Sequence, residues 1–201
     1  MAFYDRTDEL LDALDIYLID RFDELKALVP VTVDTRKLFT KIRKLYEELY
    51  EMARKYFTEL AVEVYKDHKG KTDPPDEDWI IEMLDEVDPV SKYVFANELD
   101  RRAAKLMEAL SVEGSGRTPD EEIEAAKKSM ALTYHIYAVR VTDEAAVKAM
   151  IASGVKKVKW IAEDDIHTCP VCHKMDNKIY PVDKIPPKPH INCRCWLRRV
   201  P

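Results

Sequence analysis

Hydrophobic residues recur every three or four positions through the first three quarters of the chain, the spacing of α-helices that bury one face. One stripe lies in residues 7–28 and consists of Leu10, Leu14, Leu18, Phe22 and Leu25. A longer stripe runs from residue 35 to at least Lys66, directly after Asp34, a residue type that commonly caps helix N-termini. If it is unbroken, this second helix is about 50 Å long.

Further helical segments are predicted after the charged, proline-containing turn at residues 72–78. The first is short and contains Trp79, Ile80, Met83 and Leu84. Asp88 and Pro89 form a cap and first-turn pair for the next helix, which fades near Gly114.

A linker at residues 111–122 precedes the last helical region. Within this linker Thr118 and Pro119 restart a helix, because Thr is a common N-cap and Pro is favoured in the first turn. Thr142 is interpreted as the cap of a final helix that ends at Gly154. The first 154 residues are therefore predicted to be an elongated helical body of about five to six helices.

The hydrophobic spacing changes after Gly154. Short apolar segments typical of strands follow, at residues 155–162, 178–182 and 193–200. They predict a three-stranded unit that is too small to bury much core on its own. The predicted fold class is mainly α, with a helical body at 1–114, a helical connector region at 115–154 and a small Cys/His-containing β module at 155–201.

Charge divides the chain at the same place. The net charge is −6, yet residues 155–201 carry ten Lys and Arg against five Asp and Glu, whereas the preceding residues carry 22 against 33. The acidic body argues against a protein that coats nucleic acid over its whole surface, because such binding depends on phosphate neutralisation by Lys and Arg. The basic tail leaves a local contact with DNA open.

Hydropathy predicts no contact with a membrane. No apolar run approaches the roughly 18 residues that a membrane span needs. The first ten residues carry acids where a secretory signal has a basic and then an apolar stretch. We therefore expect the chain to fold in a cytoplasm, where thiols stay reduced, and to use its cysteines as metal ligands rather than in disulfides.

All four cysteines lie in one C-terminal segment together with three of the five histidines. Cys169 and Cys172 have the spacing of a zinc knuckle, in which two thiolates from one tight turn bind a single ion. His190, Cys193 and Cys195 offer a second ligand set after 17 intervening residues. Cys193 and Cys195, two apart on a predicted strand, point to the same face, so either or both could bind. The segment predicts a structural, tetrahedral zinc site, with the choice of four ligands left open.

The alternative is that these cysteines are reduced, half-buried residues that stabilise a loop by packing alone. The zinc site is favoured because a bound metal ion would supply much of the stability of so small a unit. His167 and His173 are expected to face solvent or to form hydrogen bonds rather than to bind the ion.

Three motifs in this segment form a recognisable pattern. They are D-x-x-T-C-x-x-C from Asp165, M-D-N-K-I-Y from Met175 and P-P-x-x-H-x-N-C-R-C from Pro186. The pattern resembles the C-terminal signature of phage head-morphogenesis proteins, the minor head proteins that include the phage Mu F-like group. Residues 141–160 also resemble the family's helix, turn and Trp-bearing strand, so the similarity covers roughly residues 142–197.

The chain departs from the family pattern at three positions, with Val141 and His167 where the family has Arg and Asn177 where it has Gly. The change at 177 is mild, because Asn tolerates the left-handed conformation that such a turn needs. If the family's Arg at 167 ties strands together, that tie is weaker here. The first 140 residues show no motif-level match.

The resemblance implies a structural protein of the virion with no enzymatic activity. Members of the family associate with the portal protein and other head proteins inside the capsid, in a larger assembly. They act in head assembly or in DNA packaging and delivery, where they meet packaged DNA. The implied location is the virion, and the host cytoplasm during assembly.

Two other classes of function compete with this interpretation. A zinc hydrolase or nuclease needs an open metal position, with Glu163, Asp164 or Asp165 as a base and His167 or His173 near the phosphate. A thiolate-rich ligand set opposes it, because it fills the coordination shell and lowers the Lewis acidity of the ion. The sequence also lacks a phosphate-binding loop and the H-x-E of nucleobase deaminases.

The second competitor is a zinc module that binds nucleic acid. Its phosphate contacts would come from Lys156, Lys157, Lys159, Arg194, Arg198 and Arg199. Trp160 or Trp196 would stack on bases. The simpler interpretation is that the lysines of residues 155–162 protect an exposed strand edge.

Overall fold

The computed structural model describes residues 3–29, 34–70, 72, 74–87, 99–111, 117–163, 168–190 and 193–201. The elements in these residues are α1 (Asp5–Leu28), α2 (Thr35–Lys69), α3 (Glu77–Val87), α4 (Leu99–Ser111), α5 (Pro119–Ala152), β1 (Lys157–Ile161), α6 (Pro170–Met175), β2 (Ile179–Pro181) and β3 (Trp196–Val200). All strands of the described residues follow Gly154, which confirms the predicted fold class.

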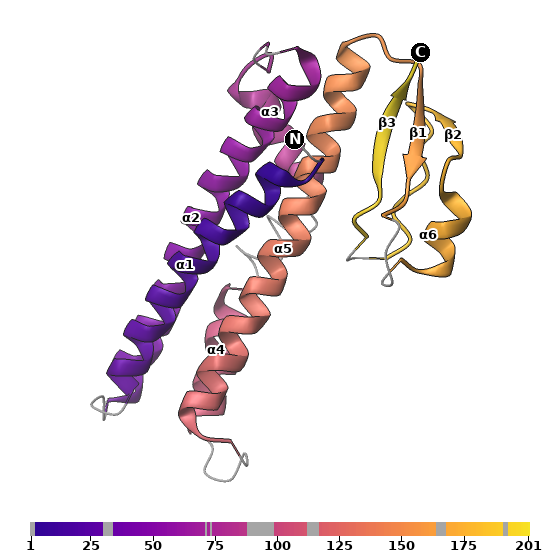
Figure 1. Cartoon of the computed structure of the whole chain (residues 1–201). Helices are drawn as coiled ribbons and strands as arrows, with labels where there is room; N and C mark the ends of the chain where they lie inside the picture. The colour runs from indigo at the N-terminus through magenta and orange to yellow at the C-terminus, as the bar shows by residue number, and fades with distance from the viewer. Residues whose placement is uncertain are drawn as a thin grey trace.

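The helical body is an elongated bundle with α5 at its centre (Figure 1). α5 packs against α1, α2, α3 and α4, and α2 also packs against α1 and α4. The predicted stripes form its core: Leu14, Phe22 and Leu49 are fully buried. Tyr134 of α5 donates a hydrogen bond to the Leu49 carbonyl at 2.8 Å, so its buried hydroxyl has a partner.

The ends of the long helices follow from their capping residues. Asp34 caps α2 as predicted, accepting hydrogen bonds from the backbone N–H groups of Arg36 and Lys37 at 3.0 and 3.2 Å. α2 continues to Lys69, one turn beyond the predicted minimum, and ends at Gly70 with φ 79°, a conformation that glycine adopts without strain. Thr118 caps α5.

The predicted helix break at Thr142 is wrong. α5 runs without interruption for 34 residues, and the Thr142 hydroxyl lies in its interior, donating to the Ala138 carbonyl at 2.8 Å and contacting the Thr7 hydroxyl at 2.7 Å. Thr142 is followed by acids, as a cap would be, but no Gly or Pro precedes it to end the helix. The predicted cap at Asp88 and Pro89 lies outside the described residues, as does Gly114.

The three strands form one antiparallel sheet in the order β2-β1-β3. Val158 and Trp160 of β1 are buried on one face, and Lys157 and Lys159 lie on the other. β1 is the central strand, so the interpretation that its lysines protect a sheet edge is wrong. The turn before β2 contains Asn177 with φ 60°, as expected from its replacement of the family's Gly.

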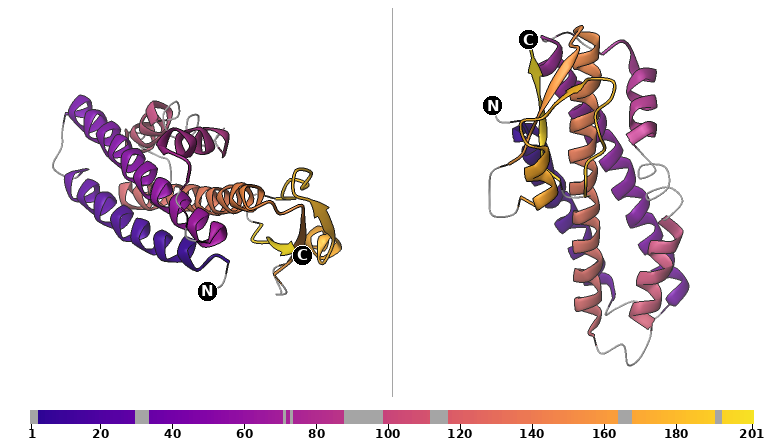
Figure 2. Two further views of the ribbon diagram at one scale, coloured as in Figure 1. Left: turned by 90° about the horizontal axis from the view of Figure 1, so that it is seen from above. Right: turned by 90° about the vertical axis from the view of Figure 1, so that its right-hand side faces the viewer.

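The module that carries this sheet lies beside the end of the bundle where the chain leaves α5 (Figures 1 and 2). The N-terminal end of α1 meets it there, since Tyr4 donates a hydrogen bond to the Cys195 carbonyl at 3.2 Å. The described part of the chain contains no helix that is both long and apolar enough to span a membrane.

Candidate metal site

The first half of the predicted metal site is built by α6, a short helix that the sequence analysis did not predict. Cys169 is its N-cap, and its thiol accepts a hydrogen bond from the backbone N–H of Cys172 at 3.4 Å. Pro170 occupies the first helical position, where its fixed φ favours the turn. The N–H of Cys172 lowers the pKa of the Cys169 thiol, because it stabilises the thiolate.

The second half comes from the segment that leads into β3. Cys193 and Cys195 lie just before this strand, which begins at Trp196, so their predicted place within a strand is wrong by one to three residues. Both side chains are nevertheless buried against Cys172. His190 reaches the same place from the preceding turn, and its Nε2 lies 3.4 Å from the Cys172 sulfur.

The five predicted ligands form two overlapping groups of three donors. One is Cys169, Cys172 and His190, and the other is Cys172, Cys193 and Cys195. Within each group the donor atoms lie within 4.8 Å of one another. Cys172 belongs to both groups and is therefore the ligand on which any metal site here depends.

Two of the donor separations match those of a tetrahedral zinc site. Two thiolates bound to one zinc at about 2.3 Å lie roughly 3.8 Å apart, and a thiolate and an imidazole nitrogen lie roughly 3.6 Å apart. The corresponding separations here are 3.6 Å from Cys172 to Cys193 and 3.4 Å from Cys172 to His190. The Cys/His groups could thus hold a metal ion.

The electrostatics of the thiols point in the same direction. Burial, reinforced by the neighbouring thiols, raises the pKa of Cys172, and burial also raises the pKa of Cys193. Several thiolates cannot share this space unless a cation compensates their charge, and metal binding deprotonates thiols for this reason. The cluster is suited to binding a cation and poorly suited to acting as a free nucleophile.

Apolar packing encloses the thiols. Trp160 is only 1% exposed and forms a small core with Cys172, Cys193 and Cys195. Val158 and Val182 of the module instead join the core of the helical bundle. The packing around the thiols therefore depends on a few residues centred on the candidate metal site.

A polar network that the sequence analysis missed joins the site to the bundle. The Lys188 ammonium donates to the Tyr4 hydroxyl at 2.7 Å and to the Cys193 carbonyl at 3.0 Å, and it forms an ion pair with Asp143 of α5 at 2.5 Å. The Tyr4 hydroxyl shares its one proton between the Asp143 carboxylate, at 2.8 Å, and the Cys195 carbonyl. Burial raises the pKa of Tyr4, so its hydroxyl keeps the proton that it donates.

Arg194, between two of the cysteines, adds a second connection. Its guanidinium donates two hydrogen bonds to the Asp8 carboxylate of α1, at 3.0 and 2.9 Å, and lies over the Tyr4 ring at 4.8 Å. These partners are more than 180 residues apart, so no local spacing in the sequence could have indicated them. One indication of such contacts is present in the sequence, which is the net positive charge of residues 155–201 and the net negative charge of the preceding residues.

Of the residues proposed for the hydrolase, the structure describes Glu163 and His173, and neither belongs to the groups of candidate metal donors. His173 is exposed on α6, as expected, and Glu163 lines a separate cavity of about 890 Å³ with residues such as His68 and Trp196. None of the five predicted metal ligands lines that cavity. Asp164, Asp165 and His167 lie outside the described residues.

The fold and the site define a class: a long helical body with a small C-terminal module whose Cys/His cluster can hold a metal ion. A family model described as phage Mu protein F like protein matches residues 95–198, which include α4, α5 and the module except its last three residues. The chain therefore belongs to the phage Mu protein F-like family, as its C-terminal motifs indicated. This family indicates a phage head morphogenesis protein. The match begins at residue 95, well before the motifs, so it includes helices in which no motif was recognised.

Comparison with curated proteins and with solved structures finds no match.

Proposed function

We propose that the protein is a minor head protein that joins the portal and other head proteins inside the capsid and acts in head assembly or DNA delivery. The observation that carries this proposal is the family match, which includes both the thiol-rich module and the helices to which it is attached. The contacts of Tyr4, Lys188 and Arg194 fix the module against the bundle. Such an arrangement suits a structural part of a larger assembly in the virion.

The proposed metal is a structural zinc. Cys172 and three of Cys169, His190, Cys193 and Cys195 would hold it. When bound, zinc supplies a rigid clip between α6 and the segment before β3, and it stabilises the thiolate forms of its ligands. A shell made mainly of thiolates leaves no open position for substrate, which supports a structural role rather than a hydrolytic one.

We expect no enzymatic activity for the same reason. The purified protein should show no turnover on nucleic acid, peptide or ester substrates, with or without added zinc. Metal-dependent nuclease activity that disappears in the Asp165→Ala variant would contradict this expectation and favour the hydrolase.

The head-protein proposal is tested by co-expression with the portal protein of the same phage. The expected result is that the full chain co-purifies with portal rings and is retained in assembled procapsids. The matched pair is Cys172→Ser, which removes the shared thiol, and His173→Ala, which alters an exposed neighbour on the same helix. Absence of the wild-type protein from both rings and particles would refute the proposal.

A second candidate, local binding of nucleic acid, is favoured by one feature of the sheet. Lys159 of β1 lies directly opposite Arg198 of β3, on the same face as Lys157. Like charges directly opposite each other destabilise a sheet, and a polyanion would relieve that repulsion. The predicted stacking role fails for Trp160, which is buried, and Trp196 already stacks on Phe3 at 5.5 Å between ring centroids.

Nucleic-acid binding predicts salt-sensitive association of the full chain with duplex DNA. The Lys159→Ala/Arg198→Ala variant should then weaken binding and reduce its salt dependence, because it removes two phosphate contacts. Equal binding by the wild type and this variant would exclude the sheet face as the contact.

A further inference from the structure

The outer face of α1 carries an exposed acidic and apolar stripe, which we term the ridge. It consists of Asp12, Asp15, Ile16, Ile19, Asp20 and Asp23, all exposed. Ile16 and Ile19 are 64% and 45% exposed, whereas the other large apolar residues of this helix are buried or half-buried. Asp12, Ile16, Ile19 and Asp23 are spaced four, three and four residues apart, so they lie on one side of the helix.

The carboxylates of the ridge are only weakly compensated by the described residues, through the charge of Lys26 near Asp23 and of His135 near Asp15. Among the described residues, Asp12, Asp15, Asp20 and Asp23 form no hydrogen bond or ion pair. Acids three or four residues apart on a helix repel one another. The two isoleucines between them also cost free energy, because their apolar side chains are exposed to water. A cationic surface with an apolar centre would relieve both costs.

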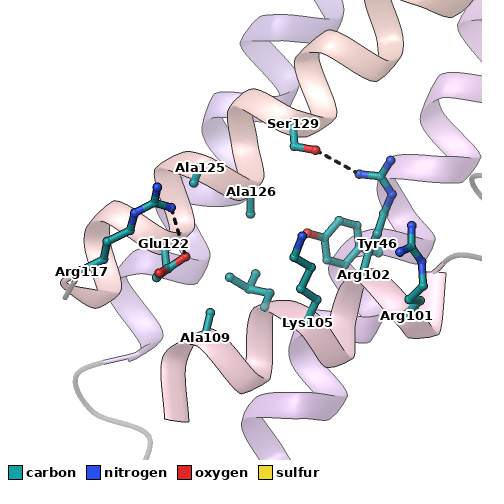
Figure 3. A pocket seen from close by; sticks show the side chains of 11 residues that line it. Tyr46, Arg101, Arg102, Lys105, Ala109, Arg117, Glu122, Ala125, Ala126 and Ser129 are labelled. Carbon is teal, nitrogen blue, oxygen red and sulfur yellow. Dashed lines mark hydrogen bonds and ion pairs between the residues drawn. The ribbon is translucent and has the colours of Figure 1, made fainter. Parts of the chain in front are cut away.

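Such a surface occurs on the same chain, in a groove between α4 and α5 (Figure 3). Its volume is about 250 Å³, and Leu106, Ala109, Ala125 and Ala126 line its centre. Figure 3 shows Ala109, Ala125 and Ala126 between two polar ends.

Cations lie at both ends of this groove. Arg101, Arg102 and Lys105 occupy one end, and Arg117, paired with Glu122 at 3.8 Å, occupies the other. Arg102 reaches Ser129 and Thr133 at 3.5 and 3.3 Å, but its buried Nε has no hydrogen-bond partner among the described residues. Four cations against one carboxylate give the groove a net positive charge.

The two surfaces have matching patterns. Along α1 the ridge presents acidic, then apolar, then acidic side chains. The groove between α4 and α5 presents cationic, then apolar, then cationic side chains. Lys105 and Ala109 are four residues apart on α4, as are Asp12 and Ile16 on α1, which is a rise of about 6 Å on each helix.

We propose that the ridge of one copy of this chain docks into the α4–α5 groove of a second copy. Ile16 and Ile19 would cover the apolar centre, and the flanking aspartates would pair with Arg101, Lys105 and Arg117. Lys105 forms no ion pair among the described residues, so it is available for this contact. The partner is a second copy rather than DNA. A phosphate backbone has no apolar surface to cover the centre of the groove, and the acidic ridge repels the phosphates.

Because the ridge and the groove are different surfaces, the contact is head-to-tail. A docked pair keeps one unused ridge and one unused groove, so association continues until a ring closes or an open array forms. This inference does not depend on the proposed head-protein role.

The test uses two charge-reversed variants of the full chain. The groove variant is Arg101→Glu/Lys105→Glu, and the ridge variant is Asp12→Lys/Asp23→Lys; all four positions are exposed, and circular dichroism checks that the helices are retained. The controls are Lys55→Glu and Glu59→Lys on α2, exposed residues outside both surfaces. Sedimentation velocity measures mass from about 1 to about 100 µM protein.

The wild type and both controls should associate with rising concentration, and less so as salt increases from about 0.05 to about 0.5 M. Each double variant should raise the dissociation constant by at least about tenfold. A mixture of the two double variants should recover association, because the intact ridge of the groove variant faces the intact groove of the ridge variant, and the two reversed surfaces are again opposite in charge. A monomeric wild type at about 100 µM, or a mixture that stays monomeric, would overturn the proposal.

Discussion

Replacing Cys172 by serine is the sharpest test of the candidate metal site. Cys172 belongs to both groups of candidate donors, whereas each of the other four ligands belongs to only one. A hydroxyl in place of this thiolate removes a ligand that no alternative arrangement of the five residues can replace. His173→Ala is the matched control, since His173 is exposed on the same short helix and belongs to neither group.

The magnitude follows from the number of ligands. Structural zinc sites contribute about 10 to 16 kcal/mol, so one of four ligands corresponds to about 3 to 4 kcal/mol. Cys172→Ser should therefore weaken zinc binding by on the order of a hundredfold to a thousandfold. Other single ligand changes should cost less, because each leaves one of the two groups of three donors intact.

The structural consequence should be confined to the module. Trp160 packs directly on Cys172, Cys193 and Cys195, whereas the long helices form a larger core, which only Val158 and Val182 of the module's described residues join as buried residues. In a Trp79→Phe background, tryptophan emission reports Trp160 and Trp196 alone. Chelation of the wild type, or Cys172→Ser without chelator, should shift this emission to the red and leave most of the helical circular dichroism unchanged.

Zinc stoichiometry decides the outcome. Protein purified without chelator should contain about one zinc per chain, measured by elemental analysis, with His173→Ala equal to the wild type. Far less than one zinc in the wild type, or unchanged zinc affinity in Cys172→Ser, would refute the reasoning. The cysteines would then be packing residues in a module stabilised by hydrogen bonds and prolines.

Three further predictions concern stability. Asn177→Val should lower the free energy of unfolding by about 1 to 2 kcal/mol and Asn177→Gly should leave it nearly unchanged, since φ is 60° at this position; denaturant titration checks both. Burial lowers the pKa of His68 below its ordinary value of 6.5, so the folded state resists protonation, and stability should fall as the pH drops below about 6.5. Melting temperatures measured at stepwise lower pH should show a smaller decline in His68→Gln. Thr7→Val should cost about 1 kcal/mol by calorimetry, because Thr142 keeps its bond to Ala138.

Local features of the sequence predicted most of the helical body. Hydrophobic spacing identified α1, α2, α3 and α5, and side chains of known capping preference identified where α2 and α5 begin. The same method failed at Thr142, because a cap-like residue inside a helix cannot be told from a true cap without knowing its partner. That partner is Thr7, 135 residues away, which no window of neighbouring residues contains.

The candidate site was predicted in composition but not in arrangement. Knuckle spacing identified Cys169 and Cys172 because both donors come from one turn. The central position of Cys172 depends on how the segment before β3 folds back onto α6, and spacing alone does not determine this. Short-range patterns also gave no sign of α6, since six residues are too few to show helical periodicity.

The network around Tyr4 links the metal site to the bundle thermodynamically. Tyr4 and Lys188 bind the backbone carbonyls of Cys195 and Cys193, so their donors are correctly placed only when the ligand segment has its folded path. A metal that fixes this segment therefore favours docking of α1 and α5 against the module, and docking favours the metal-binding conformation by the same free energy. Such reciprocity gives a physical reason why the family match includes α5 together with the cysteines, since Asp143 of α5 completes the network.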